Sequence, residues 1–133
     1  MFGSLEVIAV DRDAQSIPGV RFVQADLEDG SPWPFAGQPF GAIVVTNYLH
    51  RPLLPVLAGA LAEGGVLIYE TFMAGNERYG RPSNPNFLLK PGELLQVFAA
   101  LSVVAFEQGD TGKSVVQRVC AIRAAANGVR IPA

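Results

Sequence analysis

The sequence predicts an α/β fold whose sheet is open, mostly parallel and built of about six strands. Two observations support this prediction. Several strand-like runs are continuously apolar and rich in Val and Ile, which is typical of strands that helices cover on both faces. These runs also alternate with helical segments, and the order strand, helix, strand, helix, strand is that of an open α/β sheet.

Six runs of the sequence are interpreted as strands. They span residues Glu6–Val10, Val20–Gln24, Gly41–Thr46, Val66–Thr71, Ser102–Glu107 and Val115–Ile122. The connection between the first two runs has nine residues, and the next connection is rich in Pro and Gly. A crossover that contains a helix normally takes at least about 10–12 residues, so the first connection is too short for a full helix. The prolines and glycines of the second connection indicate a loop. One side of the sheet should therefore be thinly covered.

Two segments are predicted to be helices. In Pro52–Ala62 the apolar residues recur at helical spacing, the proline suits the first turn, and a Gly-Gly pair follows the end. Pro91–Leu101 shows the same spacing, and Glu93 lies in its first turn, where a carboxylate favours the helix dipole.

Length and composition exclude several classes of protein. A chain of 133 residues is expected to form one domain, residues 1–133, whose core needs neither disulfides nor a metal. The net charge of −2 argues against a surface for nucleic acid or for an anionic membrane, and no apolar run approaches a membrane span. The single cysteine, Cys120, fits a reducing compartment, and the N-terminus does not read as a signal peptide, so we expect a cytoplasmic protein.

Two carboxylates follow the first two predicted strands. Asp11 comes directly after the first strand, and Asp26 follows the second. Ligands of open α/β sheets bind outside the carboxyl ends of the strands, where one carboxylate can accept hydrogen bonds from both hydroxyls of a ribose. Asp26 can accept a hydrogen bond from an adenine amino group, with Leu27 beside the ring. The alternative is structural: Asp11 caps the turn that follows it, and Asp26 belongs to an acidic surface turn.

Polar side chains also stand where the third predicted strand ends. Asn47, Tyr48 and His50 lie in the region where open α/β sheets bind ligands. His50, the one histidine of the sequence, can act as a general base near neutral pH, and the alternative is a packing or helix-start role. One histidine and one distant cysteine do not make a zinc site, so no metal is expected.

A long polar loop follows the strand that ends near Glu70. Loops of this length without secondary structure are usually lids, binding elements or disordered segments. The mixture of aromatic, arginine and asparagine side chains differs from a Gly/Ser-rich linker, which favours a substrate lid over an idle loop. The polar and aromatic residues of this loop are Asn76, Glu77, Arg78, Tyr79, Arg81, Asn84 and Asn86.

Four segments, in this order, resemble the class I S-adenosylmethionine-dependent methyltransferases, and most closely the small bacterial members of the tellurite-resistance-like group. They are VIAVDRD, QADLE, VVTNYLHRPLL and LAEGGVLIYETF. GRPSNPNFLLKPGELL resembles the segment before the last long helix of this group, and AFEQG with VVQRVCAIR resembles its terminal strand pair. The resemblance covers nearly the whole chain. It implies a Rossmann-like sheet with an antiparallel terminal strand, methyl transfer to a small molecule, and S-adenosylmethionine as the cofactor.

The resemblance also implies roles for individual residues. The first acid would bind the cofactor ribose and the second the adenine, while the end of the third strand would lie beside the methionine and the methyl group. The implied cofactor-binding residues are Asp11, Arg12, Asp26, Leu27 and Thr46. The residues implied at the transfer site are Asn47, Tyr48 and His50. Those implied at the acceptor pocket are Tyr79, Arg81 and Asn84.

The chain departs from the family pattern at its start. The family's first strand and its glycine-rich loop, which contacts the methionine part of the cofactor, are absent from the sequence, so we expect a domain truncated at its N-terminus. In the family order the missing strand lies between the strands that end at Asp11 and Thr46, and its absence would leave two strand edges unpaired. Three explanations of the unpaired strand edges remain open: the flanking strands pair directly, a second copy forms a homodimer through the exposed edges, or the sequence is a shortened form of a longer one.

Three functions therefore remain open. The first is an S-adenosylmethionine-dependent methyltransferase that acts on a small molecule. The second is a non-catalytic, dimerising remnant of such a domain that does not bind the cofactor. The third is another nucleotide-binding enzyme, such as a dehydrogenase, which the missing glycine loop and the later motifs disfavour.

Overall fold

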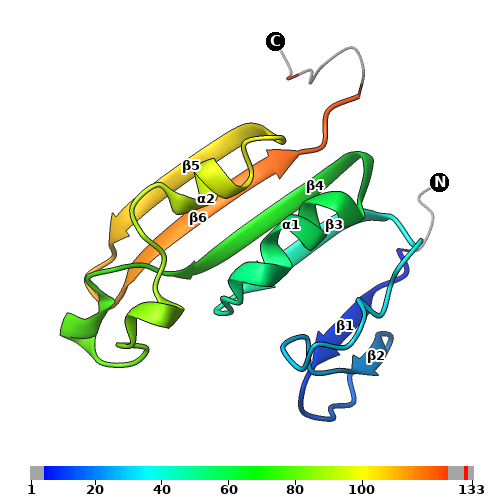
Figure 1. Cartoon of the computed structure of the whole chain (residues 1–133), viewed down its shortest axis with the longest axis horizontal. Helices are drawn as coiled ribbons and strands as arrows, with labels where there is room; N and C mark the ends of the chain where they lie inside the picture. The colour runs from blue at the N-terminus through cyan, green and yellow to red at the C-terminus, as the bar shows by residue number, and fades with distance from the viewer. Residues whose placement is uncertain (1–4, 126–130, 132–133) are drawn as a thin grey trace. The chain divides into compact units, whose positions relative to one another are not determined.

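The chain folds into two compact units. A computed structural model describes residues 5–125 and residue 131. The first unit comprises residues 1–36 and the second residues 37–133 (Figure 1). Each unit is described by itself, and the prediction of a single domain over residues 1–133 stays a prediction.

The first unit contains a pair of parallel strands. Strand β1 (Ile8–Asp11) pairs with β2 (Arg21–Gln24), and the register places Ile8 opposite Arg21 and Asp11 opposite Gln24. The connection between the two strands holds no helix, as its nine residues predicted. Because the strands are parallel, their carboxyl ends meet at the same end of the ladder.

The second unit contains a mixed sheet with the strand order β3-β4-β6-β5. Its strands are β3 (Phe40–Thr46), β4 (Leu61–Phe72), β5 (Ser102–Asp110) and β6 (Val115–Ile122). β3 runs parallel to β4, whereas β6 runs antiparallel to both β4 and β5. The predicted antiparallel terminal strand is therefore confirmed.

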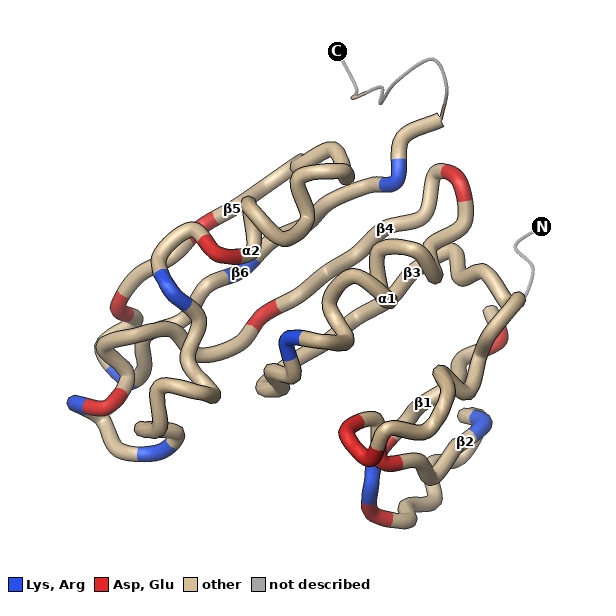
Figure 2. Tube along the Cα trace, in the orientation of Figure 1, with Lys and Arg blue, Asp and Glu red and all other residues tan. Residues whose placement is uncertain are grey.

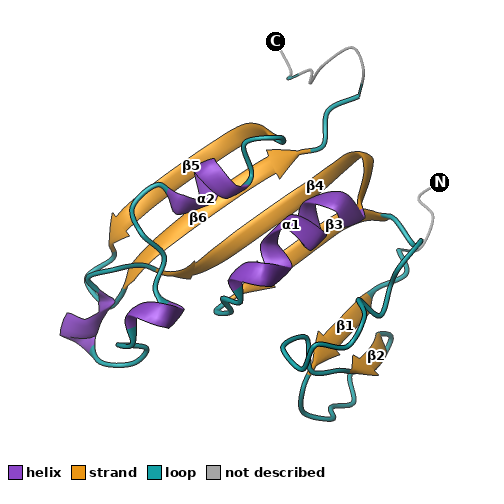
Figure 3. Ribbon diagram, in the orientation of Figure 1, coloured by secondary structure: helices purple, strands orange, loops and turns teal. Residues whose placement is uncertain are grey.

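Two helices pack on one face of the four-stranded sheet (Figure 1). They are α1 (Leu54–Ala60), which the 3-10 turn η1 (Arg51–Leu53) precedes, and α2 (Glu93–Val97). The segment between β4 and α2 contains two more 3-10 turns, η2 (Asn76–Tyr79) and η3 (Pro85–Phe87), which Figure 3 shows in purple. The largest buried apolar side chains of this unit are Tyr69, Phe98, Leu54, Leu61, Leu67, Leu89 and Leu94.

The opposite face of this sheet carries exposed apolar side chains. Val44 and Ile68 are register partners on β3 and β4, and they are 64% and 45% exposed. The continuous apolar character of both strands predicted cover on both faces. The structure differs, because α1 and α2 lie on the same face and no further α-helix occurs among the described residues of the unit. One face is thinly covered, as the connections of the sequence predicted.

The single, mostly parallel sheet of about six strands is not confirmed. The six strands of the described chain form two sheets, one of two strands and one of four. Two of the four pairings are parallel and two are antiparallel. A strand between β1 and β3 would be needed to join the sheets in the family order, and the described residues do not provide one.

Both helices are shorter than the apolar spacing predicted. The first ends at Ala60, and the chain enters β4 at Leu61. The second ends at Val97, because Phe98 leaves the helical conformation with φ −101° and ψ 28°. Phe98 and Leu101 are still buried, so the spacing identified the core-facing residues although it overestimated the hydrogen-bonded helix.

Candidate functional site

The carboxylates of Asp11 and Asp26 leave the same end of the β1–β2 ladder. Asp11 closes β1, and its carbonyl oxygen accepts a hydrogen bond from the amide of Ala25 at 3.0 Å, one residue before Asp26. Figure 2 shows acidic residues gathered around this end of the first unit. The structure therefore places the two predicted nucleoside-binding acids at neighbouring strand ends.

Both carboxylates also make local hydrogen bonds. Asp11 accepts from the amide of Asp13 at 3.1 Å and from the side chain of Gln15 at 3.2 Å, and Asp26 accepts from the amide of Glu28 at 2.9 Å. These are the turn contacts of the structural alternative. Each ionised carboxylate can accept about four hydrogen bonds, so exposed lone pairs remain for a ligand.

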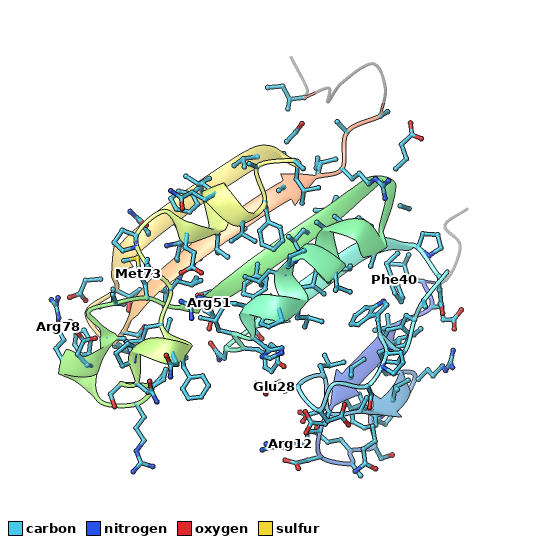
Figure 4. The ribbon with its side chains drawn as sticks, in the orientation of Figure 1. Arg12, Glu28, Phe40, Arg51, Met73 and Arg78 are labelled. Carbon is cyan, nitrogen blue, oxygen red and sulfur yellow. The ribbon has the colours of Figure 1, made fainter. Side chains whose placement is uncertain are left out.

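The neighbours of these acids are Arg12 and Leu27. Arg12 is exposed and lies 3.9 Å from the carboxylate of Asp13, a weak surface pair. Leu27, one residue after Asp26, is partly buried. Figure 4 labels Arg12 and Glu28 in this unit, on the loops that follow β1 and β2.

The turn after β3 carries four of the predicted residues in a fixed backbone conformation. Thr46 ends the strand, and Asn47 has φ 54°, the one positive φ of a non-glycine residue in the described chain. Residues outside glycine are rarely held in this left-handed region, and Asn is among those that tolerate it best. The amide of Asn47 donates to the carbonyl of Glu70 at 2.9 Å, which extends the ladder past the end of β3.

Tyr69 stabilises the turn after β3 through a hydrogen bond. Its hydroxyl donates to the carbonyl oxygen of Tyr48 at 2.5 Å, and its side chain is 1% exposed beside Phe98. Burial, the largest cause, raises the pKa of Tyr69 above its ordinary value of 10, so the phenol stays protonated and remains a donor at neutral pH. Tyr69 therefore fixes the position of the Tyr48 carbonyl, in the turn that also carries Asn47 and His50.

Replacing Tyr69 by Phe should loosen this turn. The ring stays in the core, but the carbonyl of Tyr48 loses its donor, and we expect a loss of about 1–2 kcal/mol of unfolding free energy. Urea unfolding measures this loss, and hydrogen exchange at the Asn47 amide should become faster. Tyr79→Phe is the matched control, since that tyrosine is 43% exposed. Equal effects of the two substitutions would contradict the role of Tyr69.

Arg51 links the same turn to the loop before α2. Its Nε and Nη2 donate to the two carboxylate oxygens of Glu93 at 2.8 and 3.0 Å. Nη1 donates to the carbonyl of Asn86 at 3.0 Å and Nη2 to that of Leu88 at 2.9 Å. The hydrogen bond from Arg51 is the largest cause that lowers the pKa of Glu93. Figure 4 shows Arg51 between the start of α1 and this loop.

The loop itself is held at both ends. The amide of Ala74 donates to the carbonyl of Leu89, and the amide of Leu89 donates to that of Phe72, both at 2.9 Å. The buried side chain of Asn76 accepts from the amide of Val115 at 2.9 Å and donates to the carbonyl of Pro82 at 3.0 Å. These contacts hold the loop in one conformation, and its role as a substrate lid stays a prediction.

The three predicted acceptor residues of the loop are exposed but differ in their contacts. The hydroxyl of Tyr79 donates to Asp110 at 2.7 Å, which directs it to the end of β5 and is the largest cause that raises its pKa. Asn84 accepts from the amide of Asn86 at 2.9 Å and so caps η3. Arg81 precedes a cis proline and is exposed. Their acceptor role stays a prediction.

Sequence reasoning missed Tyr69, Arg51 and Glu93. In the sequence, Tyr69 is interpreted as one residue of a buried strand, and Glu93 as an acid that favours the dipole of the helix it begins. Arg51 directly follows His50, yet its partner lies 42 positions away. Local spacing does not carry such a long-range pairing.

Three further observations concern the described residues. The described residues contain no cluster of three His, Cys, Asp or Glu side chains that could hold a metal ion. Among them there is also no helix with the length and apolar character needed to cross a membrane. An open hollow lined by Pro39, Leu61 and Arg123 lies at the amino end of β4, the opposite end from Tyr69 and the turn after β3.

Solved structures of methyltransferases resemble this chain, whereas no protein-family model and no curated protein sequence matches it. The N-methyltransferase NodS from Bradyrhizobium japonicum WM9 superposes with a TM-score of 0.62 at 14% identity, over 90% of this chain and 74% of NodS. Its complex with S-adenosyl-L-homocysteine gives a TM-score of 0.59 at 15% identity, over 88% of this chain and 66% of that one.

Two further structures agree. TehB from Haemophilus influenzae gives a TM-score of 0.65 at 14% identity, over 89% of this chain but 50% of TehB. An O-methyltransferase family protein from Burkholderia thailandensis gives 0.54 at 20% identity, over 80% of this chain and 36% of that one. The chain thus spans half of TehB and about a third of the last protein.

The chain shares the fold of these solved methyltransferases, which agrees with the resemblance seen in the sequence. At identities of 20% or less this likeness concerns the fold, because one fold serves many functions.

Proposed function

We propose that the chain functions in a methyltransferase that uses S-adenosylmethionine and a small-molecule acceptor. One observation carries this proposal: the carboxylates of Asp11 and Asp26 leave the same end of two parallel, hydrogen-bonded strands. In open α/β folds a nucleoside binds at this position, with an acid on the ribose hydroxyls. The methyltransferase fold supports the choice of cofactor.

The side chains of the first unit fit the adenosine half of the cofactor. Asp11, with Arg12 beside it, would accept hydrogen bonds from the two ribose hydroxyls. Asp26 would accept from the adenine amino group, and Leu27 would pack against the ring. Both acids are exposed, so binding a nucleoside requires no rearrangement of the core.

The turn after β3 supplies the groups for transfer. Bound S-adenosylmethionine would supply a methyl group activated by the neighbouring sulfonium. Thr46, Asn47 and Tyr48 would hold the methionine end, and His50 would accept a proton from the acceptor. Since methyl transfer is an in-line displacement, the protein's contribution is alignment and exclusion of water. The hydrogen bonds of Tyr69 and Arg51 support this proposal, because a turn with a fixed backbone would provide that alignment.

Calorimetry with S-adenosylhomocysteine tests the proposal. We expect micromolar affinity for the chain and a loss of about 100-fold in Asp11→Asn, because two hydrogen bonds to a charged acceptor are lost. Asp13→Asn is the matched control, since Asp13 lies two residues away and pairs only weakly with Arg12. Unchanged affinity in Asp11→Asn would contradict the ribose role. Tight binding of NADH instead would favour a dehydrogenase.

The second candidate function is a module that does not bind the cofactor and associates through its sheet edges. The separation of the strands into two sheets favours it, because the outer edges of β1 and β3 have no partner strand in these sheets. It predicts no heat with millimolar S-adenosylhomocysteine, together with a dimer in sedimentation velocity. We further propose a cytoplasmic location, since Cys120 is a free thiol.

A further inference from the structure

Phe87 occupies an unusual place in the loop before α2. Phe87 is 49% exposed, whereas the next two residues, Leu88 and Leu89, are 5% and 0% exposed. The chain therefore turns into the core directly after this phenylalanine. Isolated exposed apolar side chains are common, so exposure alone assigns no role.

The backbone on both sides of Phe87 is fixed by one side chain. The guanidinium of Arg51 donates to the carbonyls of Asn86 and Leu88, the two residues that flank it. η3 is also closed internally, because the amide of Phe87 donates to the carbonyl of Asn84 at 2.9 Å. An exposed aromatic ring thus stands on a backbone that has little freedom to move.

The same guanidinium links the backbone around Phe87 to the turn of the candidate transfer site. Arg51 directly follows His50, and the turn that contains His50 is fixed by Tyr69. One arginine side chain therefore joins the backbone on both sides of Phe87 to the residue that follows His50. The charge of Arg51 is balanced by a bidentate contact with Glu93, so this anchor adds no net charge.

We infer that Phe87 is the specificity-determining contact for an acceptor that carries a flat apolar group next to the methyl-accepting atom. An exposed ring offers dispersion and stacking to such a group, and a fixed backbone lowers the entropic cost of using it. This inference rests on the proposed function for the methyl-transfer step. Arg51 is the positioning residue that holds the backbone on both sides of Phe87.

Three pairs of small probes test the chemistry. Benzyl alcohol is paired with ethanol, benzylamine with ethylamine, and benzyl mercaptan with ethanethiol. The two members of a pair carry the same reactive atom, but only the benzyl compound has a ring. With labelled phenylalanine and nuclear magnetic resonance, we expect at least one benzyl probe at millimolar concentration to shift the Phe87 ring signal. Its ethyl counterpart should bind at least about tenfold more weakly, the size of one aromatic contact.

Variants separate the ring from its anchor. Phe87→Ala should weaken the benzyl probe about tenfold and Phe87→Tyr should preserve its binding, because a second aromatic ring restores stacking. Arg51→Lys should weaken it as well, since an ammonium cannot replace the bidentate fork. Val104→Ala, at a residue with similar exposure on β5, should change nothing. The inference is overturned if no benzyl probe moves the Phe87 signal, or if Phe87→Ala binds as well as the parent chain.

The cofactor experiment is independent of these results. A Phe87 signal that responds to benzyl probes in a chain without affinity for S-adenosylhomocysteine would contradict the proposed function alone. Cofactor binding without any response at Phe87 would contradict the present inference alone.

Discussion

Gln117→Leu should lower the free energy of unfolding by about 3 kcal/mol, because a backbone amide and a backbone carbonyl lose this side chain as their partner. Gln117 is 0% exposed and is the third residue of β6. Its Oε1 accepts from the amide of Leu94 at 2.8 Å, and its Nε2 donates to the carbonyl of Lys90 at 3.0 Å. It also donates to Oε1 of Gln108 at 3.1 Å.

This residue fixes the entrance to α2. The Leu94 amide belongs to the first turn of a five-residue helix, whose early amides have no partner within the helix. Leucine has a similar volume to glutamine but can satisfy none of these groups. Since small domains are stable by about 5–15 kcal/mol in total, a loss of this size is readily measured.

Urea unfolding and hydrogen exchange check the expectation. The midpoint should fall in Gln117→Leu, and the Leu94 amide should exchange faster than the amides of β4. Gln96→Leu is the matched control, because that glutamine is exposed on α2, and its effect should stay within about 0.5 kcal/mol. If Gln117→Leu is as stable as Gln96→Leu, the buried network does not hold the helix.

Patterns of apolar residues predicted where the six strands lie, although β4 begins at Leu61, within the segment predicted to be a helix, and not at Val66. Gly41–Thr46 and Ser102–Glu107 were extended by the structure to Phe40–Thr46 and Ser102–Asp110, and Val115–Ile122 agrees at both ends. Branched apolar side chains pack well on a half-buried pleated sheet, so a run of them in the sequence indicates a strand at that position. Helix ends were less predictable, because they depend on backbone conformations such as the φ of 71° at Gly92.

The arrangement of the site was predictable in part. The position of Asp11 and Asp26 at one end of parallel strands follows from the order of strands and acids along the chain. The groups that fix the turn after β3 do not follow from it. Tyr69 reaches Tyr48 across 21 positions, and Arg51 reaches Glu93 across 42. Such contacts depend on which helix packs over which strand, and no local spacing encodes that.

Arg51→Met should destabilise the second unit by about 2–3 kcal/mol near neutral pH. Glu93, whose side chain is 12% exposed, would lose both charged hydrogen bonds, and the carbonyls of Asn86 and Leu88 would lose their donor. Arg51→Lys should recover part of the loss, because an ammonium keeps the charge but not the planar fork. Arg118→Gln is the matched control, since Arg118 forms exposed pairs with Glu70 and Glu107.

The pH dependence gives the sharper test. The Arg51 hydrogen bond lowers the pKa of Glu93 below its ordinary value of 4.5, so the folded state favours the ionised form. This contribution to stability is fully present above pH 4.5 and is lost as the pH falls through the lowered pKa of the folded state. The stability difference between the parent chain and Arg51→Met should therefore be largest at about pH 7 and should shrink toward about pH 3.

Urea unfolding of both chains at a series of pH values measures this difference, with Arg118→Gln expected to cost less than about 1 kcal/mol throughout. A difference that stays constant through the acidic range would mean that Arg51 acts through its two backbone carbonyls and not through Glu93. In that case Glu93→Gln should leave the free energy of unfolding unchanged. If the ion pair stabilises the fold, the free energy of unfolding of Glu93→Gln should depend as weakly on acidic pH as that of Arg51→Met. Both substitutions act on the contact that joins the turn after β3 to the loop carrying Phe87, so this comparison also decides whether a charge or a backbone clamp holds the two together.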